Sequence, residues 1–328
     1  MQTVARKIRN KRIHMDGRKD RDDLAVDARG MTKQFGALLA VDGIDLAVGK
    51  GELFSLLGPN GAGKTTTIKM LCCLVKPTAG TATILGHDVV ENPFAVKEVI
   101  DVSPQETAVA GHLSAWENLL LMGGVYGLSK QETKARAREL IELMGLTGRT
   151  AEQVRKFSGG MQRRLSIAMA LVSDPQVLFL DEPTLGLDPQ ARRELWTHIE
   201  KFKGRKTILL TTHYLEEADA LADRVAIIDA GRIVAQGTPS QLKERLYGMQ
   251  TMLIRAKNLT SESMDGLKHR YPQATATENG VEIRARELIF DDIVDYLRSK
   301  GAKIEWLTMQ EPTLDDVFLS LTGKKADK

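Results

Sequence analysis

The chain has 328 residues, which predicts one large domain or two of moderate size, and its hydrophobic content of 42% is ordinary for a globular protein with a buried core. A net charge of +3 is too small to indicate nucleic acid as the main partner. No apolar run approaches the roughly 18 residues of a membrane helix, and the basic N-terminus lacks the apolar segment of a signal peptide, so we expect a chain that neither crosses a membrane nor is secreted.

Residues 1–22 are rich in Arg and Lys and show almost no apolar periodicity. This pattern predicts a disordered tail, or a translation start upstream of the true one with Met15 as the alternative initiator. Contact of the tail with an anionic membrane surface is the competing interpretation.

From about Leu24 the pattern becomes that of an α/β protein, and the region up to residue 80 surrounds a glycine-rich loop. The apolar run 52–57 predicts a buried parallel strand, and a helix is expected from Thr65 to Val75. Cys72 and Cys73 are neighbours on that predicted helix and point in different directions, so we expect buried packing in a reducing cytosol and neither a disulfide nor a metal site.

The loop between this strand and helix fits the phosphate-binding pattern G-x-x-x-x-G-K-[ST]. Such a loop lets backbone N–H groups and a helix N-terminus approach phosphate oxygens. We expect Lys64 to reach the β- and γ-phosphates and the Thr65 hydroxyl to ligate Mg²⁺. Upstream, Phe35 either stacks on an adenine face or is a plain core aromatic. The predicted nucleotide-binding residues of the loop are Gly58, Pro59, Asn60, Gly61, Ala62, Gly63, Lys64, Thr65 and Thr66.

Residues 113–145 change to a mostly helical pattern. The segments beginning at Ser114 and Ser129 both fit capping boxes, with Glu117 and Glu132 at the third helical position and apolar residues at helical spacing after them. Before this segment, Gln105 lies in a turn-prone stretch. It is either a surface glutamine or, as we favour in this context, a contact to Mg²⁺ and water.

Ser158-Gly159-Gly160 precedes a helix predicted to run through Leu171. A serine hydroxyl, free amides and a helix N-terminus make a second anion site. Since one chain then carries two half-sites for one γ-phosphate, the pattern suggests that two copies meet across a dimer.

Two further strands each end in residues that can carry chemistry. The strand predicted at 177–180 is followed by Asp181 and Glu182, and the strand predicted at 207–211 belongs to an apolar run that His213 closes. We expect Asp181 to hold Mg²⁺ through water, and Glu182, facing the other way, to orient or deprotonate the attacking water. His213 is either a hydrogen-bonded histidine at a strand end or, as we favour, a γ-phosphate sensor at the same sheet edge.

A second unit begins near Met249 and has the pattern of a small α+β domain. Thr313 and Asp316 are expected to cap the last helix, although Glu311-Pro312-Thr313-Leu314 echoes Glu182-Pro183-Thr184-Leu185. The predicted strands span about 224–228 in the first unit and 251–255, 281–284 and 303–308 in the second, whose helices span about 262–270, 289–299 and 313–321.

With these motifs in place, the chain resembles the ATP-binding subunit of an ABC transporter from about Leu24 to Leu246. The motifs that carry the resemblance are the Walker A motif at 58–65, the Q-loop Gln105, the signature at 157–161, Walker B at 177–181, Glu182, the D-loop Leu185-Gly186-Leu187-Asp188 and the switch His213. Details resemble the daunorubicin/doxorubicin resistance type of ABC-2 exporter, notably Thr212-His213-Tyr214-Leu215-Glu216-Glu217-Ala218 and the tail from Glu311 to Phe318. Phe157 and Phe35 depart from the commoner leucine and tyrosine; the second change keeps stacking and loses a hydroxyl.

The resemblance implies an α/β P-loop NTPase of the ABC type: a mostly parallel sheet, an antiparallel N-terminal sheet, a helical subdomain at about 106–172 and a small C-terminal α+β domain. The implied domains are the tail 1–22, an ATP-binding domain at 23–247 and an accessory domain at 248–328. It also implies that Ser158, Gly159, Gly160 and Asp188 contact nucleotide across a dimer that sandwiches ATP and Mg²⁺.

In function, the resemblance implies an ATPase at the cytoplasmic face of the membrane that drives a separate permease subunit in export, with Glu182, His213 and Lys64 as its catalytic residues. The principal alternative is a soluble ABC-type ATPase without a transport partner. A regulatory protein that binds ATP without turnover is disfavoured by intact Glu182 and His213, and an importer subunit by the C-terminal unit. Drug, lipid, polysaccharide and ion export all stay open.

Overall fold

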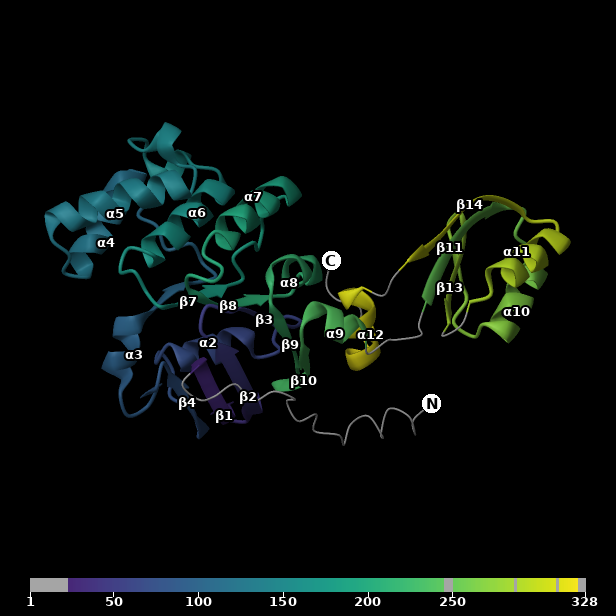
Figure 1. The fold of residues 1–328 in the computed structure, drawn as a ribbon, viewed down its shortest axis with the longest axis horizontal. Coiled ribbons are helices and arrows are strands. Elements are labelled where there is room, and N and C mark those ends of the chain that lie inside the picture. Colours follow the sequence, from purple (N-terminus) through teal and green to yellow (C-terminus); the bar gives the residue numbers. More distant parts are fainter. Residues whose placement is uncertain (1–22, 245–249, 286–287, 311–312, 324–328) are drawn as a thin grey trace.

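The computed structural model describes residues 23–244, 250–285, 288–310 and 313–323. Figure 1 shows a larger body formed by residues 23–244 and a smaller one formed by the strands and helices between residues 250 and 310. The predicted tail 1–22 and the pair Glu311-Pro312 lie outside the described residues. Within the described ranges, no helix is long and apolar enough to span a membrane.

The larger body is built on a six-stranded sheet in the order β10-β9-β3-β8-β7-β6. Its strands are β3 (Leu53–Leu57), β6 (Ile100–Ser103), β7 (Val177–Asp181), β8 (Thr207–Thr212), β9 (Arg224–Asp229) and β10 (Arg232–Gly237). β6, β7, β8, β3 and β9 run parallel, and β10 runs antiparallel to β9. The predicted mostly parallel sheet is thus confirmed.

The central strands β3, β7 and β8 are buried at every position, as their continuous apolar sequences require. Alternate residues of β3 enter two different cores: Leu53 and Leu57 pack on the helical side, and Phe54 packs on the other side. Because parallel strands end at one edge, the residues that follow β3, β7 and β8 are brought together there.

A second, antiparallel sheet in the order β2-β1-β4-β5 covers the Phe54 side. Its strands are β1 (Leu24–Phe35), β2 (Leu38–Gly49), β4 (Ala79–Ile84) and β5 (His87–Asp88), and the helices α2 (Lys64–Leu71) and α3 (Pro93–Val99) lie beside it. The prediction that helix α2 extends to Val75 is wrong, because Cys73 adopts a positive φ of 58° and the helix ends at Leu71. Cys72 is nevertheless buried, and Cys73 is half-buried.

The helical segment contains α4 (Ala115–Val125), α5 (Lys130–Leu143) and α6 (Gly159–Ala170), with short 3-10 turns at Thr147–Arg149 and Val154–Lys156. Ser114 and Ser129 cap α4 and α5 through complete capping boxes, which confirms both predictions. Three further helices of the larger body are α7 (Pro189–Glu200), α8 (Leu215–Leu221) and α9 (Pro239–Glu244).

The smaller body is a four-stranded antiparallel sheet in the order β12-β13-β11-β14, and Figure 1 shows two helices on one of its faces. In chain order its elements are β11 (Gln250–Lys257), α10 (Ser261–Arg270), β12 (Thr275–Thr277), β13 (Gly280–Ala285), α11 (Phe290–Ser299) and β14 (Lys303–Gln310). This β-α-β-β-α-β order is that of a ferredoxin-like fold.

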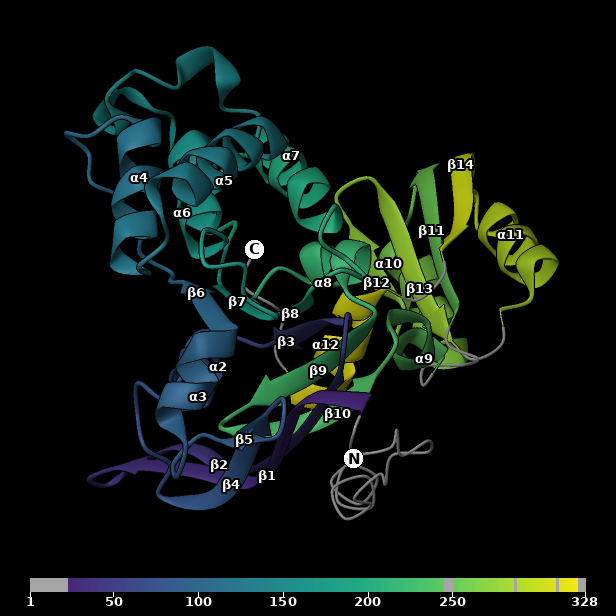
Figure 2. The ribbon, with the colours of Figure 1, turned by 60° about the vertical axis from the view of Figure 1, so that its left-hand side comes forward.

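The last helix, α12 (Leu314–Thr322), packs on α8 and α9 of the larger body, and Asp316 pairs with Arg284 of β13 at 2.9 Å. Leu314, Val317 and Phe318 are buried in the same core as the helical side of the six-stranded sheet. Figures 1 and 2 both show α12 beside α9. As predicted, Thr313 and Asp316 form its capping box. The ferredoxin-like unit is therefore held between two segments of the larger body.

Candidate functional site

The glycine-rich loop follows β3 and leads into α2, and its glycines are required by close backbone approach. Gly63 has a φ of 105°, and a Cβ there would lie 2.5 Å from the carbonyl oxygen of Ala40. A Cβ at Gly58 would lie 2.3 Å from the carbonyl oxygen of Ile228. Neither position can accept a side chain, so the loop is fixed tightly against the sheet with its amides at the N-terminus of α2.

Lys64 is 5% exposed and folds back over this loop. Its Nζ atom donates to the carbonyl oxygens of Gly58 (2.7 Å) and Pro59 (3.0 Å), and lies 2.9 Å from Oε1 of Glu182. A buried ammonium held by two carbonyls and one carboxylate provides a fixed positive charge at the loop.

Asp181 ends β7 directly opposite Thr211 of β8 in the sheet register. Its Oδ1 atom accepts hydrogen bonds from the hydroxyls of Thr211 (2.5 Å) and Thr65 (3.2 Å). Among the described residues there is no cluster of three His, Cys, Asp or Glu side chains that could hold a metal alone. One carboxylate and one hydroxyl fit Mg²⁺, which typically binds through one or two carboxylates together with phosphate oxygens and water.

Glu182 is the first residue after β7 and adopts a φ of 49°, so the alternation expected for a strand does not continue through it. Its N–H is held by Thr211, whose hydroxyl oxygen accepts it at 3.0 Å. The turn brings its carboxylate to Lys64 on one oxygen and to His213 on the other, where Oε2 lies 2.5 Å from Nδ1. A backbone held in this strained region is often found at functional sites.

His213 follows β8 and is 8% exposed. Its ring is tilted by 41° against that of Tyr214, with the two centroids 4.0 Å apart, and the guanidinium of Arg192 lies 3.8 Å from the Tyr214 ring centroid. Because Nδ1 faces Glu182, Nε2 is the ring nitrogen left for another partner. Lys64, Glu182 and His213 thus form one continuous polar chain at the sheet edge.

The other predicted site residues lie on the protein surface, around the Lys64, Glu182 and His213 side chains. Ser158 caps α6 by accepting from the N–H of Met161 at 3.3 Å, and it is exposed. Asp188 caps α7 and is also exposed, as is Gln105. Phe35 is 45% exposed, with Lys33 Nζ 4.8 Å from its ring centroid, so it is not a core residue.

Two buried charged residues of the site were missed by the sequence analysis. Arg163 of α6 donates to backbone carbonyls of β7, the turn after it and the segment that contains Gln105. Its only sequence signal is that it stands at helical spacing with Ile167 and Ala170, on the apolar face of α6. The second residue is Glu217 of α8, which accepts from Trp196 Nε1 at 3.0 Å.

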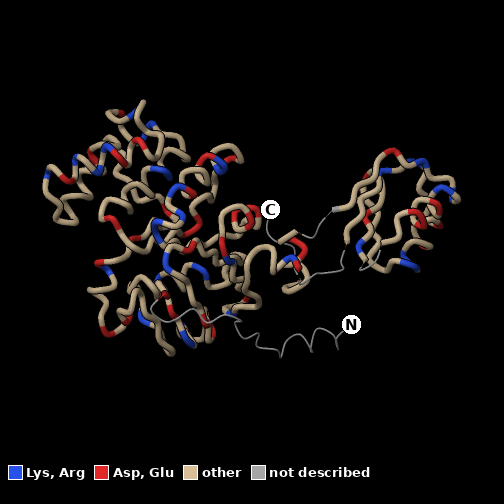
Figure 3. The backbone as a smooth tube through the Cα atoms, viewed as in Figure 1, with Lys and Arg blue, Asp and Glu red and all other residues tan. Residues whose placement is uncertain are grey.

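Burial dominates the ionisation of both residues. It raises the pKa of Glu217 to about 7, while hydrogen bonding with Thr212 and with Trp196 opposes that rise. Burial also lowers the pKa of Arg163 to about 10, against the attraction of Asp181, Glu217 and Glu182. Elsewhere, acidic and basic residues are interspersed along the chain, as Figure 3 shows.

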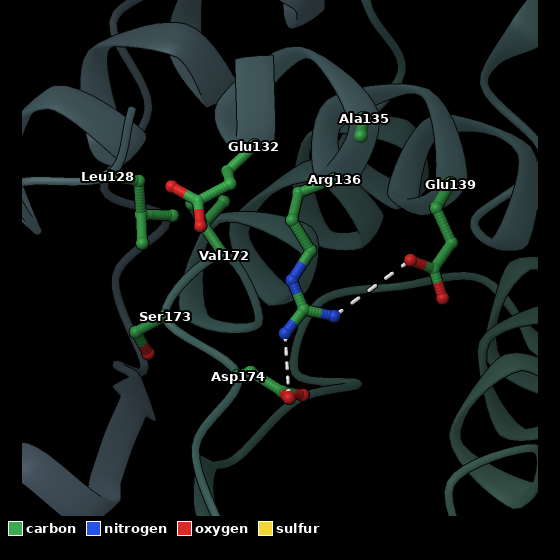
Figure 4. Close-up of a pocket in the computed structure, with 8 residues that line it drawn as sticks. All are labelled: Leu128, Glu132, Ala135, Arg136, Glu139, Val172, Ser173 and Asp174. Carbon is green, nitrogen blue, oxygen red and sulfur yellow. Dashed lines mark ion pairs between the residues drawn. The ribbon is translucent and has the colours of Figure 1, made fainter. Parts of the chain in front are cut away.

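A shallow groove of about 390 Å³ lies between α5 and the loop after α6 (Figure 4). Arg136 crosses it to pair with Asp174 at 2.7 Å and with Glu139 at 3.8 Å. Its lining contains none of the predicted site residues, and the phosphate loop contributes nothing to it.

Known protein families match the larger body and the C-terminal part of the chain separately. A family model described as ABC transporter matches residues 41–185, and one described as ATP-binding protein DrrA1-3-like, C-terminal domain, matches residues 237–322. The second match begins before β11 and includes α9 and α12 as well as the ferredoxin-like unit.

Several proteins are similar over nearly the whole chain. The daunorubicin resistance ATP-binding protein DrrA3 of Streptomyces coeruleorubidus is 40% identical over 313 residues, covering 92% of this chain and 96% of the relative. The doxorubicin resistance ATP-binding protein DrrA of Mycobacterium tuberculosis (strain ATCC 25618 / H37Rv) is 41% identical, with coverages of 92% and 94%. The Nod factor export ATP-binding protein I of Rhizobium sp. (strain N33) is 38% identical, with coverages of 93% and 99%.

Solved structures resemble the larger body. An ATP-binding subunit of an ABC transporter has a TM-score of 0.60 at 30% identity and covers 67% of this chain and 92% of its own. A dimeric ATP-binding cassette in a post-hydrolysis state with ADP and Pi has a TM-score of 0.58 at 26% identity and covers 65% of this chain and 98% of its own.

Proposed function

Since the protein belongs to the DrrA-like family of ABC transporter ATP-binding proteins and is an ABC-type ATPase, we propose that it drives an exporter. It would do so by binding and hydrolysing ATP at the cluster formed by the Lys64, Glu182 and His213 side chains. This cluster of three buried, polar side chains beside a phosphate loop is the observation that carries the proposal. A soluble ABC-type ATPase without a transport partner is the alternative.

Nucleotide phosphates bind the loop from Gly58 to Thr66 and the ammonium of Lys64. Thr65 and Asp181, already joined by a hydrogen bond, supply ligands to Mg²⁺, and Gln105 completes the set from its exposed loop. Thr65 and Asp181 would hold Mg²⁺ there, and the ion would supply positive charge that offsets the negative charge of the phosphates. Phe35, exposed near the end of β1, stacks on the adenine ring.

Hydrolysis needs a group that orients and deprotonates water in line with the γ-phosphorus. Glu182 has this role, because its carboxylate is fixed on both oxygens by Lys64 and His213. His213 senses the γ-phosphate through Nε2 while Nδ1 holds Glu182. The proton removed from water passes to Glu182, and the products are ADP and inorganic phosphate.

The active unit is a dimer in which Ser158, Gly159, Gly160 and Asp188 of one chain complete the site of the other. The exposure of Ser158 and Asp188 and the dimeric cassette among the similar structures support this arrangement. The dimer closes when it binds ATP and reopens after hydrolysis, and this movement drives transport.

The movement of the dimer is transmitted to a separate permease subunit at the cytoplasmic face of the membrane. Relatives of comparable identity are named for daunorubicin resistance and for Nod factor export, so we infer that the permease and not this chain selects the cargo. The permease docks against the segment 106–112, where Glu106, Ala108, Ala110 and His112 are exposed.

The test of function is Mg²⁺-dependent ATPase activity of the purified chain, and the test of partnership is crosslinking in cells. Single cysteines along 106–112 should crosslink to a membrane protein, and cysteines in α10 should do so weakly; the chain with its own Cys72 and Cys73 gives the background. If ATPase activity is present but no surface crosslinks to a membrane protein, the soluble ATPase is the correct function.

A further inference from the structure

Arg163 occupies the junction of three functional segments of the larger body. Its side chain is almost fully buried, with 4% of the residue exposed. Nη2 donates to the carbonyl oxygen of Asp181 at 2.7 Å, and Nε donates to that of Pro183 at 2.8 Å. Nη1 donates to the carbonyl oxygens of Pro104 at 2.5 Å and Gln105 at 3.3 Å.

These four acceptors belong to segments with different proposed tasks. Pro104 and Gln105 lie next to the surface where we place the permease, and Asp181 and Pro183 flank Glu182. Arg163 itself belongs to α6, the helix that Ser158 caps. One rigid side chain therefore connects the permease side, the catalytic turn and the helix that presents the γ-phosphate contacts to the second chain.

Arginine is suited to this position for reasons of geometry. Its planar guanidinium presents five donors in a fixed fork, so it can hold carbonyls on two sides at fixed angles, whereas a lysine ammonium is a single point of charge on a flexible stem. Burial lowers the pKa of Arg163 to about 10, and the carboxylates of Asp181, Glu217 and Glu182 oppose that effect, so the group is charged at neutral pH.

We propose that Arg163 is a positioning residue that couples the Pro104–Gln105 segment to α6 and to the turn of Glu182, so that the segment and the helix move as one unit. It touches no reacting atom and acts through the backbone of the groups that do. This inference rests on the proposed ATPase function.

Arg163→Lys, with Arg164→Lys as its matched control, tests the coupling. Arg164 is adjacent on α6 but faces His198, with Nη1 3.4 Å from Nε2, and it makes none of the hydrogen bonds that Arg163 makes to residues 104, 105, 181 and 183. Since misplacement of catalytic groups by about 1 Å can cost roughly a hundredfold in rate, we expect Arg163→Lys to lower kcat at least about tenfold with little change in nucleotide affinity. Arg164→Lys should stay within about twofold of wild type.

Amide hydrogen exchange of the wild-type chain provides a second measurement that needs no variant to fold. On addition of a non-hydrolysable ATP analogue with Mg²⁺, the amides of 105–107 and those of 159–163 should gain protection together. In the Arg163→Lys variant, the protection of one segment on addition of the analogue should no longer accompany protection of the other. A thermal melt reports whether the variant is folded.

The outcomes separate this inference from the proposed function. A wild-type chain without ATPase activity overturns the function itself. An active wild type with an Arg163→Lys variant of unchanged kcat, or with losses of kcat and affinity in equal measure, overturns the coupling role alone. Wild-type exchange in which the amides of 159–163 gain protection and those of 105–107 do not also overturns the coupling role.

Discussion

The Nζ atom of Lys64 lies 2.9 Å from Oε1 of Glu182, and each residue is 5% exposed. Glu182 is bound on its other oxygen by His213, so a cation proposed to bind phosphate and the carboxylate proposed to activate water restrain each other. Removing one member of a buried pair leaves a charge without its partner, so substitutions of Lys64 or Glu182 should have large effects.

Glu182→Gln should lower kcat by at least about a hundredfold and leave ATP binding intact, because the amide keeps the size of the side chain but cannot accept a proton. Since reopening depends on hydrolysis, the variant should accumulate as an ATP-bound dimer in sedimentation. Turnover near the wild-type rate would show that another group activates the water.

Lys64→Ala should act at an earlier step, because the charge-assisted contact to the β- and γ-phosphates is lost. Calorimetry should show ATP affinity reduced by about tenfold or more, equivalent to about 1.4 kcal/mol. Lys69→Ala is the control, since Lys69 is exposed on the same helix. Equal affinities for the two variants would remove the role of Lys64 in binding.

Ser158→Arg should abolish ATP-dependent dimerisation and preserve ATP binding by the single chain, because its own phosphate loop is unchanged and a bulky cation enters the shared interface. The substitution also removes a helix cap, worth about 1 kcal/mol. Ser129→Arg removes the equivalent cap of α5 and serves as the control for that loss. Sedimentation that shows normal dimers of Ser158→Arg would place the signature outside the interface.

Glu217→Gln should change the pH dependence of stability. Burial raises the pKa of Glu217 to about 7 in the folded protein, above the ordinary value of about 4.5. The wild-type protein should therefore lose stability as the pH rises from about 4.5 through 7, because the buried carboxyl group loses its proton over that range. Glutamine does not ionise, and the free energy of unfolding of the variant relative to wild type should therefore increase over that window, by up to roughly 3 kcal/mol. Denaturant titrations at pH 5 and pH 8 measure it. A difference that is the same at both pH values would mean that Glu217 does not titrate in this range.

Much of this fold was readable from the sequence where the signal is local. The apolar runs of β3, β7 and β8 have lengths and flanking residues that favour buried parallel strands, and complete capping boxes mark the starts of α4 and α5. The convergence of Lys64, Asp181 and His213 then follows from parallel strands sharing an edge.

What the sequence did not show depends on contacts between distant segments. The positive φ of Glu182 is set by the hydrogen bonds of its N–H to Thr211. Arg163 resembles the neighbouring Arg164 in sequence, and only its acceptors at residues 104, 105, 181 and 183 distinguish it. The early end of α2 at Leu71 likewise reflects one backbone angle, that of Cys73, which propensity does not reveal.

The return of α12 to the larger body determines how this protein can be made and dissected. Leu314, Val317 and Phe318 are synthesised only after the whole ferredoxin-like unit, so on the ribosome the core of the larger body stays incomplete until the chain has passed residue 318. A chain stopped at residue 249 would expose the surface that these three side chains cover and should aggregate. Excising 250–310 and joining α9 to α12 with a flexible linker removes the ferredoxin-like unit while it keeps that core closed.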